Sequence, residues 1–139
     1  MPEKETLERA HEDAREGKAP STQAGEFVRE EMDHIREGKH GARSTKQAIA
    51  IGLSKARRAG VKLGTPKGVS EKTKKQAMND ERRAKSSRKP STRRSRATTA
   101  ALKREGSQAA SKKSLAAHAR LGPRGRSSAA QKAARTRAA

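Results

Sequence analysis

The feature that most constrains the fold of this chain is its shortage of large apolar side chains. Leu, Ile, Val and Phe together supply 13 of the 139 residues, about 9 %. A highly charged chain with less than roughly 20 % of these residues usually buries too little surface to offset the entropy of folding. Nearly all the large apolar residues of the first half lie between Phe27 and Leu63. We therefore expect the folded core within residues 21–64.

Two helices are predicted in this window. In residues 22–37 apolar side chains recur at spacings of three and four, which is typical of one helical face. In residues 45–59 Ser44 and Gln47 form a capping box, and Gly60 followed by Val61 predicts a Schellman ending. The small side chains on the apolar face of this second helix should let another helix approach closely. We expect an antiparallel helical hairpin whose packing core is Phe27, Val28, Met32, Ile35, Ile49, Leu53 and Ala56.

The two flanking regions differ in composition. Residues 1–20 predict an acidic N-terminal helix over 2–16, with a thin apolar face. Residues 65–139 are rich in Lys, Arg, Ser and Ala, and we expect this basic tail to be largely disordered alone. Its segments 71–86, 97–105, 107–120 and 127–137 have helix-friendly composition and could gain helix on phosphates. The predicted fold class is all-α: an acidic helix, a hairpin and a disordered tail.

Charge is distributed very unevenly along the chain. Residues 1–40 carry 7 Lys and Arg against 11 Asp and Glu, whereas residues 41–139 carry 28 against 4, giving +20 in total. A long basic run with few acids favours a polyanionic partner, and nucleic acid is the usual one. Two alternatives stay open: the run is a solvated linker, or the N-terminal carboxylates mimic a polyanion and compete for the tail.

Candidate nucleic-acid-binding residues are the cations of the acid-free stretches. No acid occurs from Gly41 through Val69, and one face of the predicted helix 45–59 is basic. The candidates are Lys46, Lys55, Arg57, Arg58, Lys62, Lys67, Arg93, Arg94, Arg96, Arg120, Arg124 and Arg126.

A short motif near the C-terminus suggests one mode of binding. Residues 122–127, Gly-Pro-Arg-Gly-Arg-Ser, resemble the AT-hook core Pro-Arg-Gly-Arg-Pro, in which Arg-Gly-Arg lies in a narrow A·T minor groove. Ser127 replaces the second proline. The alternative is a plain Gly-Pro linker between two alanine-rich segments.

Several classes of protein are disfavoured. The chain has no cysteine, so it has no disulfide framework and no zinc finger. His11, His34, His40 and His118 are scattered without a metal-binding motif, and no P-loop or Gly-x-Ser-x-Gly occurs. We therefore expect no enzyme activity, catalytic residue, metal, cofactor or small-molecule substrate. No apolar stretch approaches 18 residues, which predicts a cytoplasmic protein without a membrane partner.

The stretch KQAIAIGLSKARRAG, from Lys46 to Gly60, resembles the core of a family of small basic bacterial proteins of unknown function. Residues 32–39 are similar to the family's Met-x-Glu-Phe-Lys-x-Gly-Lys, and the resemblance covers about residues 27–64. Lys55 stands where the family usually has Glu. Members are sometimes labelled DNA-binding or plasmid stabilisation. The tail also resembles linker-histone-like basic tails. The family likeness implies a bacterial cytoplasmic protein, and a cytoplasmic or nucleoid location also follows by elimination.

These observations predict a non-enzymatic protein that binds DNA largely independently of sequence, through phosphate neutralisation. The first alternative is an RNA- or ribosome-associated protein, because RNA presents the same phosphates. The second is a protein–protein adaptor that docks through Ile49, Leu53 and Ala56. Self-association through the hairpin is a further possibility.

Overall fold

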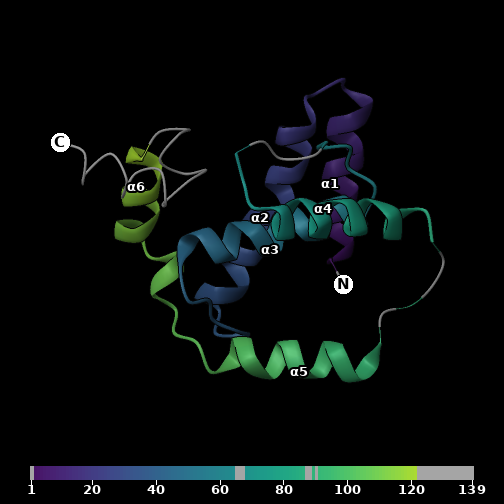
Figure 1. Cartoon of the computed structure of the whole chain (residues 1–139). Coiled ribbons are helices and arrows are strands. Elements are labelled where there is room, and N and C mark those ends of the chain that lie inside the picture. The colour runs from purple at the N-terminus through teal and green to yellow at the C-terminus, as the bar shows by residue number, and fades with distance from the viewer. Residues whose placement is uncertain (1, 65–67, 87–88, 90, 122–139) are drawn as a thin grey trace, which may run out of the picture.

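The computed structural model of this chain describes residues 2–64, 68–86, 89 and 91–121 (Figure 1). All regular structure in these residues is helical, which confirms the predicted all-α class. The elements in order are α1 (Lys4–Arg15), α2 (Pro20–Arg36), α3 (Thr45–Arg58), α4 (Glu71–Ala84), α5 (Thr92–Lys103), the 3-10 turn η1 (Gln108–Ala110) and α6 (Lys112–Arg120).

Helices α2 and α3 end where their local sequence predicts. Gly38 adopts a φ of 76° after α2, and Gly60 adopts a φ of 102° after α3. The amide of Val61 donates to the carbonyl of Ala56 over 3.0 Å, and that of Gly60 donates to Arg57 over 3.1 Å. This pair of bonds is the expected Schellman motif, which satisfies carbonyls that the helix leaves free.

The start of α3 is capped from both sides. The Ser44 hydroxyl accepts from the amide of Gln47 over 3.1 Å, as a capping residue does. The Gln47 side chain reaches back and accepts from the amide of Arg43 over 2.6 Å. The reciprocal pair differs from the standard capping box only in bonding one residue earlier.

The hairpin packs closely because α3 has a glycine at the contact. A Cβ placed on Gly52 would lie 2.7 Å from the Cα of Val28, so the two backbones meet directly. Ala48 packs with Met32 and Ile35, whereas Ala56 packs with Ala24 and Phe27. Contacts that run in opposite sequence directions confirm the antiparallel hairpin.

Two apolar clusters lie on this hairpin. The first joins α2 and α3 to the segment around η1, and the second joins them to α1. The first consists of Met32, Ile35, Ala42, Ala48, Ala109 and Ala110, with Val28, Ile49 and Leu115 against it. The second consists of Ala10, Ala24, Phe27, Ala56 and Val61, with Leu7, Leu53 and Leu63 against it. All seven predicted packing residues lie in these clusters.

The acidic N-terminal helix forms as α1 and packs beside α2 (Figure 1). Thr6, Ala10 and Asp13 are buried on its inner face. The Arg9 guanidinium donates to Glu26 on α2 over 2.8 Å. A face with little apolar area is therefore supplemented by polar contacts.

The expectation that residues 65–139 are largely disordered is corrected for 68–86 and 91–121, which contain α4, α5, η1 and α6. Helix α4 packs on α3 through Ala77 and Asp80, both buried. The Ser54 hydroxyl donates to the Asp80 carboxylate over 2.5 Å. Charge and small residues, rather than large apolar ones, attach this helix. The predicted segment 127–137 lies outside the described residues.

The segment after α5 is held mainly by backbone bonds. The amide of Gly41 donates to the carbonyl of Leu102 over 2.8 Å, and that of Ala42 donates to Gly106 over 3.1 Å. The Thr45 hydroxyl donates to the carbonyl of Ala109 over 2.6 Å. A count of large apolar side chains does not register such contacts, which is why the prediction of disorder failed here.

Candidate nucleic-acid interface

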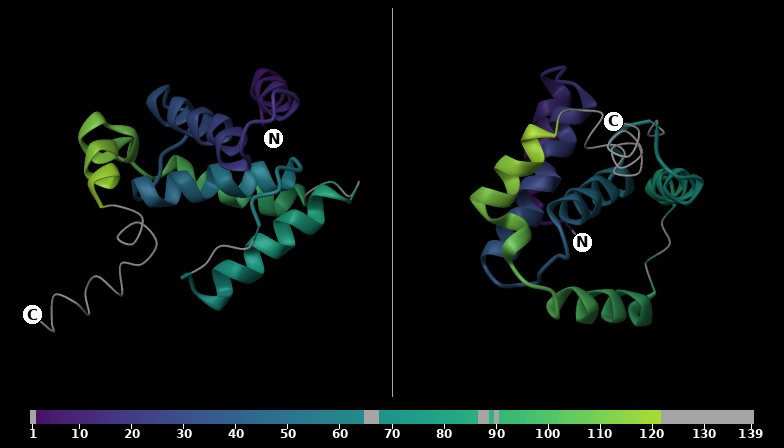
Figure 2. Two further views of the ribbon diagram at one scale, coloured as in Figure 1. Left: turned by 90° about the horizontal axis from the view of Figure 1, so that it is seen from above. Right: turned by 60° about the vertical axis from the view of Figure 1, so that its left-hand side comes forward.

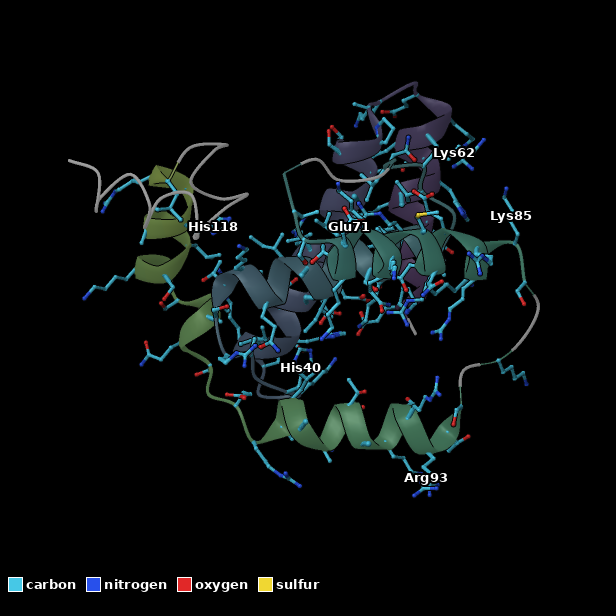
Figure 3. All side chains as sticks on the ribbon, in the orientation of Figure 1. His40, Lys62, Glu71, Lys85, Arg93 and His118 are labelled. Carbon is cyan, nitrogen blue, oxygen red and sulfur yellow. The ribbon has the colours of Figure 1, made fainter. Side chains whose placement is uncertain are left out.

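Helix α5 stands apart from the other helices, as Figure 1 and the right-hand view of Figure 2 show. None of its residues is buried, and only Leu102, near the end that joins the core, is half-buried. Its first half carries Arg93, Arg94 and Arg96 and the helix has no acid. The labelled Arg93 lies on the side of α5 that faces away from the molecule (Figure 3). The helix is a basic rod exposed to solvent along its length.

A basic cavity of about 810 Å³ lies between the end of α4 and the beginning of α5. Four cations and no acid line it. The lining residues are Asn79, Arg82, Arg83, Ser86, Lys89, Ser91 and Arg94. Within the described part of the chain, the four cations form no ion pair. The amides of the first turn of α5 add positive potential at the same place, because a helix N-terminus favours anions.

Most acids of the basic half are held in ion pairs or hydrogen bonds with their neighbours. Asp80 is 2 % exposed and accepts from Ser54 and Gln76. Glu81 lies 4.0 Å from the Arg57 guanidinium, and Glu71 lies 3.4 Å from Lys74. The outer surface from the end of α4 through α5 is therefore strongly positive.

The predicted binding residues fall into three groups. Six are exposed and available to an anion: Lys46, Lys62, Arg93, Arg94, Arg96 and Arg120. Three lie outside the described residues: Lys67, Arg124 and Arg126. The latter two belong to the AT-hook-like segment, whose residues after Leu121 are not described either. Lys55, Arg57 and Arg58 form the third group.

These three cations of α3 are engaged within the fold. The Lys55 ammonium donates to Glu31, a fully buried carboxylate on α2. The Arg57 side chain is 11 % exposed and donates to the carbonyl of Gly64 over 3.3 Å. Arg58 lies 3.8 Å from Asp80. The structure thus assigns Lys55 and Arg57 to helix packing rather than to an outer binding face.

Sequence reasoning did not select Arg82, Arg83 or Lys89. One signal was present: no acid occurs from Arg82 through Arg104, a second acid-free stretch after the one from Gly41 to Val69. Because residues 65–139 were expected to be disordered, this stretch did not predict a cavity, which forms only when α4 and α5 are folded.

The histidines are also closer together than their sequence positions suggest. His34 and His40 stack edge to face with ring centroids 5.9 Å apart. The Nε2 of His34 lies 3.1 Å from Glu3 Oε1, and the Nε2 of His40 lies 2.9 Å from Glu31 Oε2. The hydrogen bond from His34, with further contact from Lys39, lowers the pKa of the Glu3 carboxyl from its usual value.

Residues 19–68 match the model of one protein family. Its description reads "Family of unknown function (DUF6496)", and the match spans α2, α3 and the turn that follows. This finding agrees with the resemblance of residues 27–64 to a family of unknown function. No curated protein and no solved structure matches the chain. None of the helices described here has both the length and the apolar character that crossing a membrane requires.

Proposed function

We propose that this is a non-enzymatic, nucleoid-associated protein of the bacterial cytoplasm that binds DNA with little base preference. The main support is the basic cavity between α4 and α5, in which four cations meet without a neutralising acid. Unpaired arginines facing one space suit phosphate oxygens, which they bind through several N–H donors at once.

The proposed mechanism is phosphate neutralisation with positioning by the fold. Arg82, Arg83 and Arg94 bind one phosphate region in the cavity, and Arg93 and Arg96 bind neighbouring phosphates along α5. The α2–α3 hairpin holds this surface in position, because α4 packs on α3. Contacts to phosphate orient a protein on the duplex but do not read sequence. Affinity then comes mainly from the release of counterions.

The test is fluorescence anisotropy with duplex DNA at several salt concentrations. Engagement of about 5–10 phosphates predicts a slope of log K against log[salt] of roughly −5 to −9. The triple variant Arg82→Ala, Arg83→Ala, Arg94→Ala should make that slope less negative by about 3, since each lost contact contributes about 0.9.

The matched control removes three exposed cations from the acidic end of the molecule: Lys4→Ala, Arg15→Ala, Arg29→Ala. It changes the net charge equally but leaves the cavity intact, so its slope should stay close to that of the wild type. Equal slopes for the two triple variants would show that only total charge matters. A flat salt response of the wild type would contradict DNA binding altogether.

The RNA-binding alternative uses the same cations, so competition between duplex DNA and structured RNA at matched salt separates the two. For the adaptor alternative, much of the required surface is already used: Ala56 is fully buried, and Ile49 and Leu53 are half-buried against the two clusters. Ile49 and Leu53 also line a cavity of about 600 Å³ between α3 and α4, which is the surface that an adaptor would use.

A further inference from the structure

The histidine cluster carries an inference independent of DNA binding. One ligand atom each of Glu31, His34 and His40 lies within 4.8 Å of the other two. Glu31 and His34 are three residues apart and share one face of α2, and His40 follows the helix at the turn. The residue before α1, Glu3, lies against His34.

The surroundings of His40 point to a cation between its ring and Glu31. Its Nδ1 lies 2.9 Å from the carbonyl oxygen of Gly41, which only accepts, so Nδ1 carries a proton. In the neutral ring, Nε2 then carries a lone pair instead of a proton. This atom nevertheless lies 2.9 Å from the Oε2 oxygen of the Glu31 carboxylate. Two acceptors at this distance require a proton or a metal ion between them. Hydrogen bonding of Nδ1–H to a carbonyl is also how ligating histidines are usually oriented.

The buried Glu31 carboxylate keeps one oxygen directed at His40. Glu31 is 0 % exposed, and Lys55 occupies only its Oε1 oxygen, which leaves Oε2 for a second cation. Glu3, Glu30 and His34 form a second group of the same kind, which shares His34.

We propose that Glu31, His34 and His40 bind one Zn²⁺ ion, with a water molecule in the fourth position. Two imidazoles and one carboxylate form a ligand set that zinc commonly takes. Zinc bonds of about 2.0–2.2 Å place tetrahedral ligand atoms roughly 3.3–3.6 Å apart. The Glu31–His40 pair, now 2.9 Å apart, would therefore open slightly on binding the ion, and wider separations within the 4.8 Å limit would close.

Isothermal titration of ZnCl₂ into the untagged, chelator-treated full-length protein tests this proposal. We expect one equivalent of Zn²⁺ to bind with micromolar or tighter affinity. His40→Gln and His34→Gln should each weaken binding at least about tenfold. The control His11→Gln removes an exposed histidine outside both groups and should bind as the wild type does.

A spectroscopic measurement on the wild type tests the proposal even if the histidine variants fail to fold. Co²⁺ in place of Zn²⁺ should give the intense visible absorption of tetrahedral coordination, and one equivalent of Zn²⁺ should abolish it. Absence of this spectrum, or of stoichiometric Zn²⁺ binding, overturns the proposal. Equal loss of binding in His11→Gln and His40→Gln also overturns it, because the ion would then be held by surface histidines in general.

Discussion

At the scale of single residues, two glycines in the hairpin have opposite roles. Gly52 on α3 meets the backbone of Val28, so any side chain there would push the two helices apart. Gly25 on α2 has nothing within 4 Å of the position a Cβ would take. One glycine is therefore required by packing, whereas the other only adds flexibility to the unfolded chain.

We expect Gly52→Ala to lower the free energy of unfolding by about 1–3 kcal/mol, as overpacking of a close contact does. Gly25→Ala is the control and should raise it by about 0.5–1 kcal/mol, because alanine favours the helix. Urea denaturation followed by circular dichroism measures both. A neutral Gly52→Ala would mean that the helices are not in direct contact.

The buried ion pair of Lys55 and Glu31 is a second feature at the scale of single residues. A glutamate at position 55 would face the buried Glu31 carboxylate. A sequence comparison interprets Lys55 as one more surface charge. Only the fold shows that its ammonium compensates a carboxylate on another helix.

At the scale of elements, α4 is attached to α3 mainly through one buried carboxylate. Asp80 receives hydrogen bonds from Ser54 and Gln76 and lies beside Arg58, so it joins α4 to α3. Besides Ala77, it is the only residue of α4 that is buried. The attachment of the basic surface to the hairpin thus depends mainly on Asp80, with the Arg57–Glu81 pair as a second polar link.

Asp80→Ala should therefore release α4, with a loss of roughly 1–3 kcal/mol from the unpaired partners. Hydrogen exchange of the amides in 71–84 should accelerate more than exchange in α2. Glu71→Ala removes an exposed acid from the same helix and serves as the control. Equal protection of α4 in the two variants would show that Asp80 is not its anchor.

The elements also show what the sequence could predict. The bounds of α2 and α3 were close to prediction because caps such as Ser44 and Gly60 act within a few residues. The docking of α4 and of residues 102–115 was not predictable, because it depends on Asp80, on alanines and on backbone bonds between distant residues. The histidine cluster was not predicted for the same reason: His34 and Glu3 meet only after the segment before α1 packs against α2.

At the scale of the whole molecule, the C-terminal segment completes the core of the hairpin. Ala109 and Ala110 are buried with Met32 and Ile35. Thr45 at the start of α3 donates to Ala109, and Arg36 at the end of α2 donates to Ala110. One face of the hairpin is thus covered by residues that lie more than 60 positions further along the chain.

Replacing Thr45 by valine keeps the shape and leaves the Ala109 carbonyl without its donor. We expect a loss of about 1 kcal/mol or somewhat more, with faster hydrogen exchange around η1. Thr98→Val on the exposed helix α5 is the control and should stay within about 0.5 kcal/mol of the wild type. Unchanged hydrogen exchange at η1 in Thr45→Val would show that the bond from Thr45 to Ala109 does not hold this segment in place.

The bonds from Gly41 to Leu102 and from Ala42 to Gly106 have a consequence for synthesis of the protein. A ribosome releases the hairpin long before it has made residues 102–110, so Met32 and Ile35 first emerge beside an unfilled site. Closing a loop of this length is slow compared with forming local helices. During that interval the nascent chain presents an uncovered apolar face next to an acidic helix, and the same face is covered only after residues 102–110 have left the ribosome.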